Sequence, residues 1–496
     1  MSESLKKKLV AVISYLYILL FVYAAVSKLL DFENFTVQLG QSPLLSAFAG
    51  WVAAGVPAIE IAISIMLAIP RWRLPGLYLG FGLMTMFTAY IYIILNHTSF
   101  IPCSCGGILE KMGWTEHLIF NLAFMGLALA GILAARRCRG FNSAAKSATK
   151  IMGVAVAGTA FVTGLFLWSE RIIHKDNNFV RRYREAAYKI FEADLAYNSF
   201  YPAGANDAGV FIGNHTDPLR VLFWSGDKPP ATRRIDMDLS TIMSGSVQLR
   251  THNGEFILAD GPNAAIYHGD LELLRVSATL RVPFRFSHIA PGGANTFFCR
   301  TSDTERGEPD LASINFKGRT GSKISHSLLT RQVDGFFDKD GTLCADPGQG
   351  RLIYLYRYRN QYIVADSSLA PLPPGRTIDT ISRANITVAH VKSRNERKMS
   401  APPLVVNKNA AVYKNLLFVQ SALRGRYEPA EPLNQASVID VYDHARREYV
   451  LSFYFYHFKG GKLRDFIVHD DRLYGFAGTH AICYELTEIL TGHYRP

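Results

Sequence analysis

The sequence predicts a protein of two structural classes, an all-α bundle of membrane-spanning helices followed by an all-β propeller of about six blades. The chain has 496 residues, more than one hydrophobic core ordinarily organises. Up to about residue 170 charged residues are sparse and stand in short clusters between long apolar runs. Beyond that point they are spread evenly among glycine, proline and aromatic residues. The first part is therefore typical of a membrane domain, and the second of a soluble domain.

Five apolar segments of the first part are long enough to cross a hydrocarbon core of about 30 Å. The first follows three lysines and lacks a small-residue cleavage site, which favours a membrane helix over a removed signal peptide. The expected spans are residues 9–27, 44–69, 74–95, 118–135 and 151–168. Five spans place the two ends of the chain on opposite sides of the membrane.

Loop charges orient the bundle, because short loops rich in lysine and arginine stay cytoplasmic. One face carries Lys6, Lys7, Lys8, Arg71, Arg73, Arg136, Arg137, Arg139, Lys146 and Lys150. The loops with Asp31 and Glu33, and with Cys103 and Cys105, fall on the other face. We therefore expect a bacterial inner-membrane protein with a cytoplasmic N-terminus and a periplasmic C-terminal domain. This topology explains much of the net charge of +12 without a nucleic-acid partner.

These patterns divide the chain into three parts. Residues 1–140 are expected to form a four-helix transmembrane domain. Residues 141–192 hold a linker, the fifth span and a juxtamembrane helix, which helical spacing of apolar residues predicts over 178–191. Residues 193–496 form the β-domain.

Beyond residue 195 short strand-like runs alternate with turns. Residues 351–358 and 359–366, for example, are typical of a hairpin with a tight turn. Further predicted strands are residues 209–213, 220–224, 254–259, 263–267, 296–299, 416–420, 438–442, 450–456, 472–478 and 480–485. Roughly 300 residues of such hairpins fit about six four-stranded blades. A large sandwich or two barrels are the alternatives.

The loop between the third and fourth spans, with the sequence PCSCGG at 102–107, carries the most distinctive chemistry. Two cysteines one residue apart can close a small, strained disulfide, and strain makes a disulfide exchange easily. A helix N-terminus or a cation would be needed to lower the thiol pKa, and the start of the fourth span and His117 are candidates. A metal site is a weaker alternative, since two thiols need two more ligands and only His97 and His117 are near. A structural clip is the third.

Glu60 lies inside the second span, where a carboxylate costs about 3 kcal/mol and usually has a partner or a function. Lys28, at the end of the first span, is the expected partner. A structural ion pair and a proton-handling site are both open interpretations. Both side chains should face the bundle interior, in one pocket near the thiol loop.

Residues 1–135 resemble the MauE family within the DoxX-like membrane proteins. The resemblance rests on Ser27-Lys28, on VPAIE at 56–60, and above all on PCSCGGILE at 102–110 followed by WTEHLIFN at 114–121. Members of that family are linked to the maturation of disulfide-containing periplasmic enzymes, with methylamine dehydrogenase as the namesake case. A propeller after this block resembles proteins of Bacteroidetes with six-bladed, TolB-like domains.

The resemblance implies a membrane redox role. Cys103 and Cys105 would cycle between dithiol and disulfide, beside a pocket shaped by Lys28, Glu60, Trp114 and His117. A quinone is the one cofactor that this role suggests, and tyrosines of the spans could flank it. Placement at the membrane–water interface and helix packing explain most of these tyrosines without a ligand. Those tyrosines are Tyr15, Tyr17, Tyr23, Tyr78, Tyr90 and Tyr92.

The other cysteines have simpler interpretations. Cys138 stands among arginines on the expected cytoplasmic face. Cys299, Cys344 and Cys483 are an odd set for an oxidising compartment, so at least one is unpaired within the domain. Buried strand cysteines are favoured over a bond between Cys299 and Cys344.

Two functional hypotheses follow. The first is an inner-membrane thiol-disulfide redox protein that assists the maturation of periplasmic clients, with a propeller that binds the client or a partner. The alternative is a non-catalytic membrane anchor whose propeller is a scaffold or a peptide-binding or sensing module, with a structural CSC loop. Both expect the lipid bilayer and a periplasmic protein or peptide as partners, and neither expects a nucleic acid or a bound metal.

Overall fold

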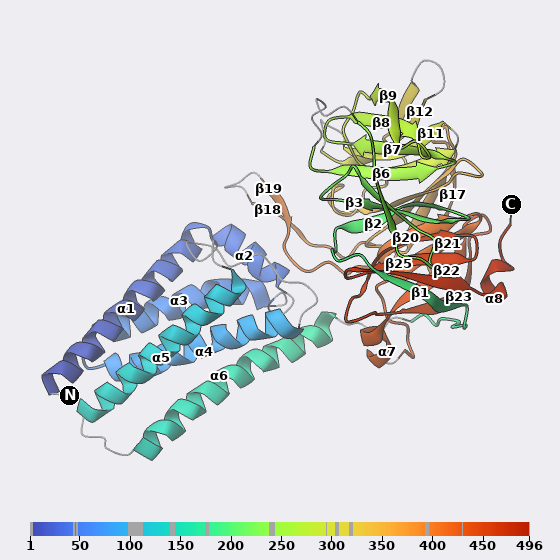
Figure 1. The fold of residues 1–496 in the computed structure, drawn as a ribbon. Coiled ribbons are helices and arrows are strands. Elements are labelled where there is room, and N and C mark those ends of the chain that lie inside the picture. The colour runs from blue at the N-terminus through green and yellow to red at the C-terminus, as the bar shows by residue number, and fades with distance from the viewer. Residues whose placement is uncertain are drawn as a thin grey trace. The chain divides into compact units, whose positions relative to one another are not determined.

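The structure is a computed structural model (Figure 1) that describes part of the chain. The described residues are 3–42, 45, 48–97, 113–138, 144–173, 178–237, 244–293, 295–302, 307–316, 321–391, 396–428 and 430–495. They form two compact units. The helical unit consists of Met1–Lys175 and Ile386–Pro403, and the β unit of Asp176–Asn385 and Leu404–Pro496.

The helical unit contains five helices that are long and apolar enough to cross a membrane. They are α1 (Glu3–Leu30), α3 (Ala49–Ala68), α4 (Arg73–His97), α5 (Trp114–Cys138) and α6 (Ala144–Ile173). Each contains most or all of one predicted span, which confirms the five expected spans. In Figure 1, α6 lies at the outside of the bundle, where it packs against α4.

Small residues let the helices of the bundle approach closely. A Cβ at Gly80 of α4 would lie 3.2 Å from the ring of Tyr17, and one at Gly131 of α5 would lie 3.2 Å from Ile13 and Leu77. Glycine at such positions brings helix backbones together where lipid supplies no hydrophobic drive for association. The Tyr17 hydroxyl donates a 2.7 Å hydrogen bond to the Phe124 carbonyl, which joins α1 to α5.

A short helix and a hairpin, both outside the predicted elements, complete the helical unit. The helix is α2 (Phe32–Gln41), and the hairpin pairs β18 (Val388–Val391) with β19 (Glu396–Met399). Lys398 Nζ donates a 3.1 Å hydrogen bond to Asn34 Oδ1. At Gly40 the backbone of Ser400 comes so close that a Cβ would lie 1.7 Å from its carbonyl oxygen. Only glycine fits there, so the hairpin sits directly on the α2 backbone.

The β unit contains six four-stranded sheets, which we number as blades 1 to 6. Blade 1 consists of β2 (Phe200–Asn206), β3 (Gly209–Asn214), β4 (Arg220–Trp224) and β5 (Ala231–Arg234). Blade 2 consists of β6 (Val247–His252), β7 (Glu255–Asp260), β8 (Ala265–Asp270) and β9 (Arg275–Arg281). Blade 3 consists of β10 (Phe286–Gly293), β11 (Thr296–Ser302), β12 (Pro309–Asn315) and β13 (Gly321–Ser325).

Two short helices accompany the remaining three blades: α7 (Ala430–Gln435) precedes β22, and α8 (Glu488–Thr491) follows β26. Blade 4 consists of β14 (Gly341–Asp346), β15 (Arg351–Tyr356), β16 (Gln361–Ala365) and β17 (Pro371–Arg376). Blade 5 consists of β20 (Asn407–Tyr413), β21 (Leu416–Ser421), β22 (Ala436–Asp443) and β23 (Glu448–Tyr456). Blade 6 consists of β24 (Leu463–His469), β25 (Arg472–Ala477), β26 (His480–Leu486) and β1 (Ala187–Asp194).

The sheets close into a ring. The first strand of each blade contacts the first strand of the next, in the order β2, β6, β10, β14, β20, β24 and back to β2. Paired strands within each blade are antiparallel; β1, from the beginning of the unit, pairs with β26 near its end. This is a six-bladed propeller, which confirms the predicted fold class and rules out the sandwich and the barrels. Strand β1 fastens the ring by completing the last blade.

Local sequence explains both the hairpins and the buried strands. Asn253 and Gly254 have positive φ values of 48° and 77°, the conformation of the tight turn that joins two antiparallel strands. In β15 every residue after Arg351 is buried, because neighbouring blades cover both faces of the sheet. Such strands show continuous apolar runs instead of alternation.

The juxtamembrane helix predicted over 178–191 is wrong. Residues 178–186 contain no helix, and 187–194 form β1. Tyr183 forms a parallel bridge with Ser452 of β23, and its ring stacks on Tyr454 at 4.5 Å. Pairing with two blades satisfies the backbone of this segment and overrides its helical periodicity.

Arg181 anchors this segment to blade 5. Its side chain is fully buried and bonds Asp440 (Nε to Oδ1, 2.7 Å) and Glu428 (Nη1 to Oε2, 2.7 Å). Its Nη2 also donates to Ser421 Oγ at 2.8 Å and to the Leu423 carbonyl at 3.0 Å. The guanidinium is thereby held by partners from several parts of the blade. Arg181 thus holds residues 178–186, which precede β1 in the chain, against blade 5.

We predict that Arg181→Met lowers the free energy of unfolding of the β unit by about 3–5 kcal/mol, because it leaves two buried carboxylates without their cation. Pulse proteolysis of the full-length protein in detergent, over a urea series, measures this loss. Exposed Arg184 provides the matched control, and Arg184→Met should change stability by no more than about 0.5 kcal/mol. Equal stability of the two variants would contradict the prediction.

Candidate functional site

The helical unit contains a cavity of about 350 Å³ that gathers the four predicted pocket residues. Lys28, Glu60, Trp114 and His117 all line it. The rest of its wall is mainly apolar and aromatic and includes Phe21, Phe35, Leu39, Leu83, Phe87, Phe120 and Val162. Residues from α1, α2, α3, α4, α5 and α6 contribute. Side chains far apart in the sequence thus meet in one enclosed space.

Lys28 and Glu60 form an ion pair at this cavity. The Lys28 Nζ atom contacts Glu60 Oε1, and the Glu60 side chain is completely buried. The Lys28 ammonium also lies 5.7 Å from the centre of the Phe87 ring and 5.9 Å from that of Phe35. Aromatic faces at such distances stabilise a cation. The pair therefore joins α1 to α3 inside an apolar environment.

Two buried polar atoms of the cavity wall lack a hydrogen-bond partner among the residues that the structure describes. They are Glu60 Oε2 and Asn121 Nδ2. Leaving a buried polar group unpaired costs about 1–3 kcal/mol. Glu60 offers an acceptor and Asn121 a donor, beside the ammonium of Lys28 and the half-buried imidazole of His117. The arrangement suits a ligand with an apolar body and a polar end.

The thiol loop joins the helices that form this cavity. Cys103 and Cys105 lie outside the described residues, in the segment between the end of α4 at His97 and the start of α5 at Trp114. Trp114 and His117, in the first turn of α5, line the cavity. The chain therefore enters the cavity wall directly after the thiol loop. Asn121 is the residue of this site that the sequence analysis did not single out as a pocket residue, although it closes the WTEHLIFN motif.

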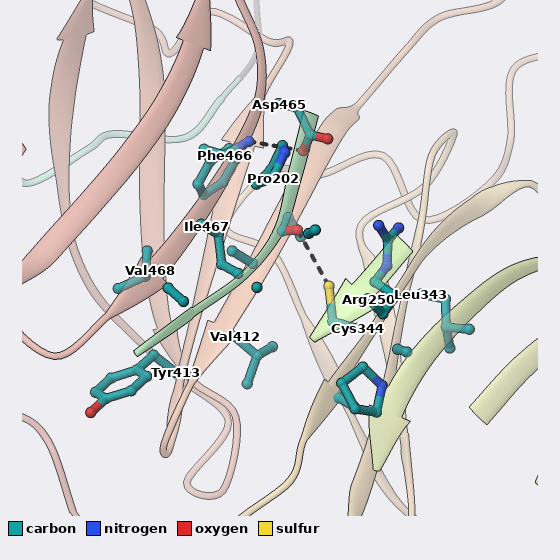
Figure 2. A pocket seen from close by; sticks show the side chains of 18 of the residues that line it. Pro202, Arg250, Leu343, Cys344, Val412, Tyr413, Asp465, Phe466, Ile467 and Val468 are labelled. Atoms are coloured by element: carbon teal, nitrogen blue, oxygen red, sulfur yellow. Dashed lines mark hydrogen bonds between the residues drawn. The ribbon is translucent and has the colours of Figure 1, made fainter. Parts of the chain in front are cut away.

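A second cavity, of about 1070 Å³, runs through the centre of the β unit and is lined by the first strand of every blade. Figure 2 shows Arg250 from β6, Cys344 from β14 and Asp465 from β24 around it. These residues come from three blades and share no motif, so no spacing in the sequence could have predicted the site. Among the residues described, no three His, Cys, Asp or Glu side chains are placed to hold a metal ion.

The cysteines of the β unit are free thiols. Cys299, Cys344 and Cys483 are buried in β11, β14 and β26, so the alternative of a bond between Cys299 and Cys344 is wrong. Burial raises the pKa of Cys344 and of Cys483 to about 12, and that of Cys299 well above its usual range. The Cys344 thiol donates to the Ala410 carbonyl at 3.3 Å. These thiols stay protonated and unreactive at neutral pH.

We predict that a maleimide at about pH 8 labels Cys138 in the folded protein and spares Cys299, Cys344 and Cys483, because thiolate is the reactive form. Peptide mass spectrometry assigns each labelled site. Denaturation in urea should expose all three propeller cysteines to the reagent. Rapid labelling of Cys344 in the native protein would contradict its enclosure.

We predict that Lys28→Met destabilises the helical unit by about 3–5 kcal/mol, since it leaves a buried carboxylate unpaired. The double variant Lys28→Met with Glu60→Gln should recover most of that loss. Thermal unfolding in detergent, followed by the helical circular dichroism signal, compares them. A double variant as unstable as the single one would show that the pair contributes no coupling.

Most of the first 140 residues resemble a known protein family. Residues 6–134 match the family model described as "Methylamine utilisation protein MauE". No curated protein matches the chain. Among solved structures, a member of the DUF4221 family from Bacteroides vulgatus is 11% identical, with a TM-score of 0.37, and covers 63% of this chain and 99% of its own. BamB from Moraxella catarrhalis is 9% identical, with a TM-score of 0.31, and covers 63% and 100%.

The propeller assignment rests on the strand order of the β unit and not on these distant structures. For the helical unit, the family match spans four of the five long helices and contains all of the motifs from which the resemblance was inferred. That resemblance is therefore confirmed, and residues 6–134 are similar to the MauE family.

Proposed function

We propose that this protein is a thiol-disulfide redox protein of the bacterial inner membrane that assists the maturation of periplasmic client proteins. The observation that carries the proposal is the cavity that collects Lys28, Glu60, Trp114 and His117 where the chain leaves the thiol loop. The propeller is proposed to hold the client or a partner. The match of residues 6–134 to the MauE family supports the same role.

The distribution of basic residues supports a cytoplasmic N-terminus. Lys6, Lys7 and Lys8 stand at the start of α1, and Arg136 and Arg137 at the end of α5. Lysine and arginine mark the cytoplasmic ends of membrane helices. Lys28, near the end of α1, and Trp114, at the start of α5, then belong to the periplasmic end. In this orientation the thiol loop and the β unit are both periplasmic.

The proposed reaction is disulfide exchange. Cys103 and Cys105 as a disulfide accept two electrons from a client dithiol: a client thiolate attacks one sulfur, the bond between the two loop cysteines breaks, and a mixed disulfide forms. The second client thiolate then displaces the loop cysteine, which leaves a client disulfide and a loop dithiol. The electron balance requires an acceptor that returns the loop to its disulfide.

A quinone bound in the cavity of the helical unit is the proposed acceptor. A bound quinone would take up two electrons and two protons and become a quinol as the loop dithiol closes to a disulfide. Among the described residues Asn121 Nδ2 has no acceptor and Glu60 Oε2 has no donor, so they could bond a carbonyl oxygen and a hydroxyl respectively. Phe35, Leu83 and Phe87 would enclose the ring and exclude water. The unpaired polar atoms thus match the two polar groups of such a ligand.

We predict that Cys103 and Cys105 change redox state in cells during a pulse of reductant, which alkylation trapping and mass spectrometry detect. Cys105→Ser should accumulate a mixed disulfide by the reverse step, because the Cys103 thiolate can attack a client disulfide while no second loop thiol remains to release the client. A pair that never changes state, or full client maturation in the Cys103→Ser, Cys105→Ser variant, would exclude redox exchange. Either outcome would favour the alternative hypothesis, a non-catalytic membrane anchor with a structural CSC loop.

The quinone is tested with the same protein in detergent. A dithiol peptide and a short-chain quinone are mixed with it, and the loss of quinone absorbance is followed. Asn121→Leu and Glu60→Gln should slow this step about tenfold or more, as the loss of a hydrogen bond to a ligand predicts. Ser14→Ala, which alters a buried hydroxyl of α1 that does not line the cavity, should keep the rate. Equal rates for all variants would remove the quinone and leave the thiol exchange intact.

A further inference from the structure

The central channel of the propeller is lined by three cations, Arg250, Lys408 and Arg464, that form no ion pair with a described carboxylate. We propose that the part of the channel between these three residues, which we call the basic end, binds an anionic group, a carboxylate or a phosphate, of a ligand that enters the channel. The inference concerns a site in the β unit and does not depend on the redox role proposed for the helical unit. It assigns a chemical class of ligand to the propeller.

The strand directions place two of the three cations near one end of the channel and the third, Arg250, deeper inside it. Gln248 Nε2 donates to the Ser287 carbonyl, and Arg250 Nε to the Ile289 carbonyl, so β6 and β10 run in parallel. The first strands of all blades of a propeller share one direction through the channel. Lys408 and Arg464 are the second residues of β20 and β24, and Arg250 is the fourth of β6.

The cations are oriented by backbone carbonyls and not by carboxylates. Arg250 donates to the carbonyls of Leu249 and Ile289, and Arg464 to those of Asn198 and Phe200. Among the described residues no carboxylate oxygen lies within 4.0 Å of either guanidinium or of the Lys408 ammonium. Arg250 Nη2 also lies 3.5 Å from Gln248 Oε1. A guanidinium has five N–H donors, so each arginine keeps donors without an acceptor among the described residues.

Several other charges at or near the channel are compensated. Asp340 pairs with Arg357 at 2.8 Å and with Arg300 at 3.3 Å. At the far end of the first strands Asp207 pairs with His469 at 2.9 Å. Lys414, at the same far end, is a single cation whose ammonium lies over the rings of Tyr413 and Tyr494. The three cations of the basic end have no such compensation among the described residues.

Asp465 is the carboxylate close to the basic end among the residues that the structure describes. Its Oδ1 accepts hydrogen bonds from Asn409 Nδ2 at 2.7 Å and from the Phe466 amide at 2.8 Å. Burial raises its pKa, and Arg250 only partly opposes that effect. A single carboxylate, already held by two donors, does not neutralise three cations.

Burial is the first cause of the low pKa of two histidines near this site, and the arginines add to it. Burial, Arg300 and Arg250 lower the pKa of His288 to about 4. Burial, Arg464 and Arg250 lower the pKa of His215. A bound anion would favour the protonated form of both histidines.

The test is a titration of the full-length protein in detergent at low salt. Three probes are used: inorganic phosphate, a hexaglutamate peptide and a hexalysine peptide, with isothermal calorimetry as the readout. The proposal expects binding of at least one anionic probe and none of hexalysine. Binding of phosphate alone would assign a small free anion, and tighter binding of hexaglutamate would assign an acidic peptide.

The variants locate the site. Arg250→Met and Lys408→Met should each weaken binding of the anionic probe about tenfold or more, because a charge-assisted contact is lost. Arg376→Met makes the same charge change on exposed β17, outside the channel, and should bind as the parent does. Lys408 is exposed, so its variant should fold even if Arg250→Met does not. No binding of either anion, or equal binding by Lys408→Met and the parent, would overturn the proposal.

Discussion

A carboxylate inside a membrane helix needs a partner, and in this protein the partner is Lys28, which reaches Glu60 from the preceding long helix. The pair joins α1 to α3 and places one cation and one anion beside an otherwise apolar cavity. Either charge without the other would raise the free energy of inserting its helix into the bilayer. Together they make a polar corner possible, and the unpaired atoms of Glu60 and Asn121 give that corner unused capacity for hydrogen bonds. The proposed redox chemistry depends on this corner.

In the β unit the corresponding constraint is closure. The last blade of the propeller is completed by β1, and Arg181 anchors the residues that precede β1 to blade 5. Closure brings six first strands around one channel, and their side chains then create a charge pattern that no single blade contains. The segment Ile386–Pro403, between β17 and β20 in the chain, belongs to the helical unit, where its hairpin lies on α2. The close approach of Ser400 to Gly40 makes that contact specific.

Much of this architecture is encoded locally. Long apolar runs determine the five membrane helices, and short apolar runs with tight turns determine most strands, because each depends only on neighbouring residues and on water or lipid. The ion pair was also predictable, since a charge within a span demands a partner. The helix expected over 178–191 failed because strand pairing with β26 outweighed local periodicity. The helix α2 was missed because it is short and its acidic start and Gly40 are typical of a loop.

Local residue patterns were enough to predict the two structural classes, the membrane spans, and the pairing of Lys28 with Glu60 from the cost of a charge in lipid. Which residues share a cavity depends on how the helices and blades pack. Asn121 lies in the pocket because α5 packs against α1 and α4, whose side chains line the same cavity. Arg250, Lys408 and Arg464 became one basic end because ring closure brings three distant strands together. Such sites depend on strand register and closure, which no local pattern records.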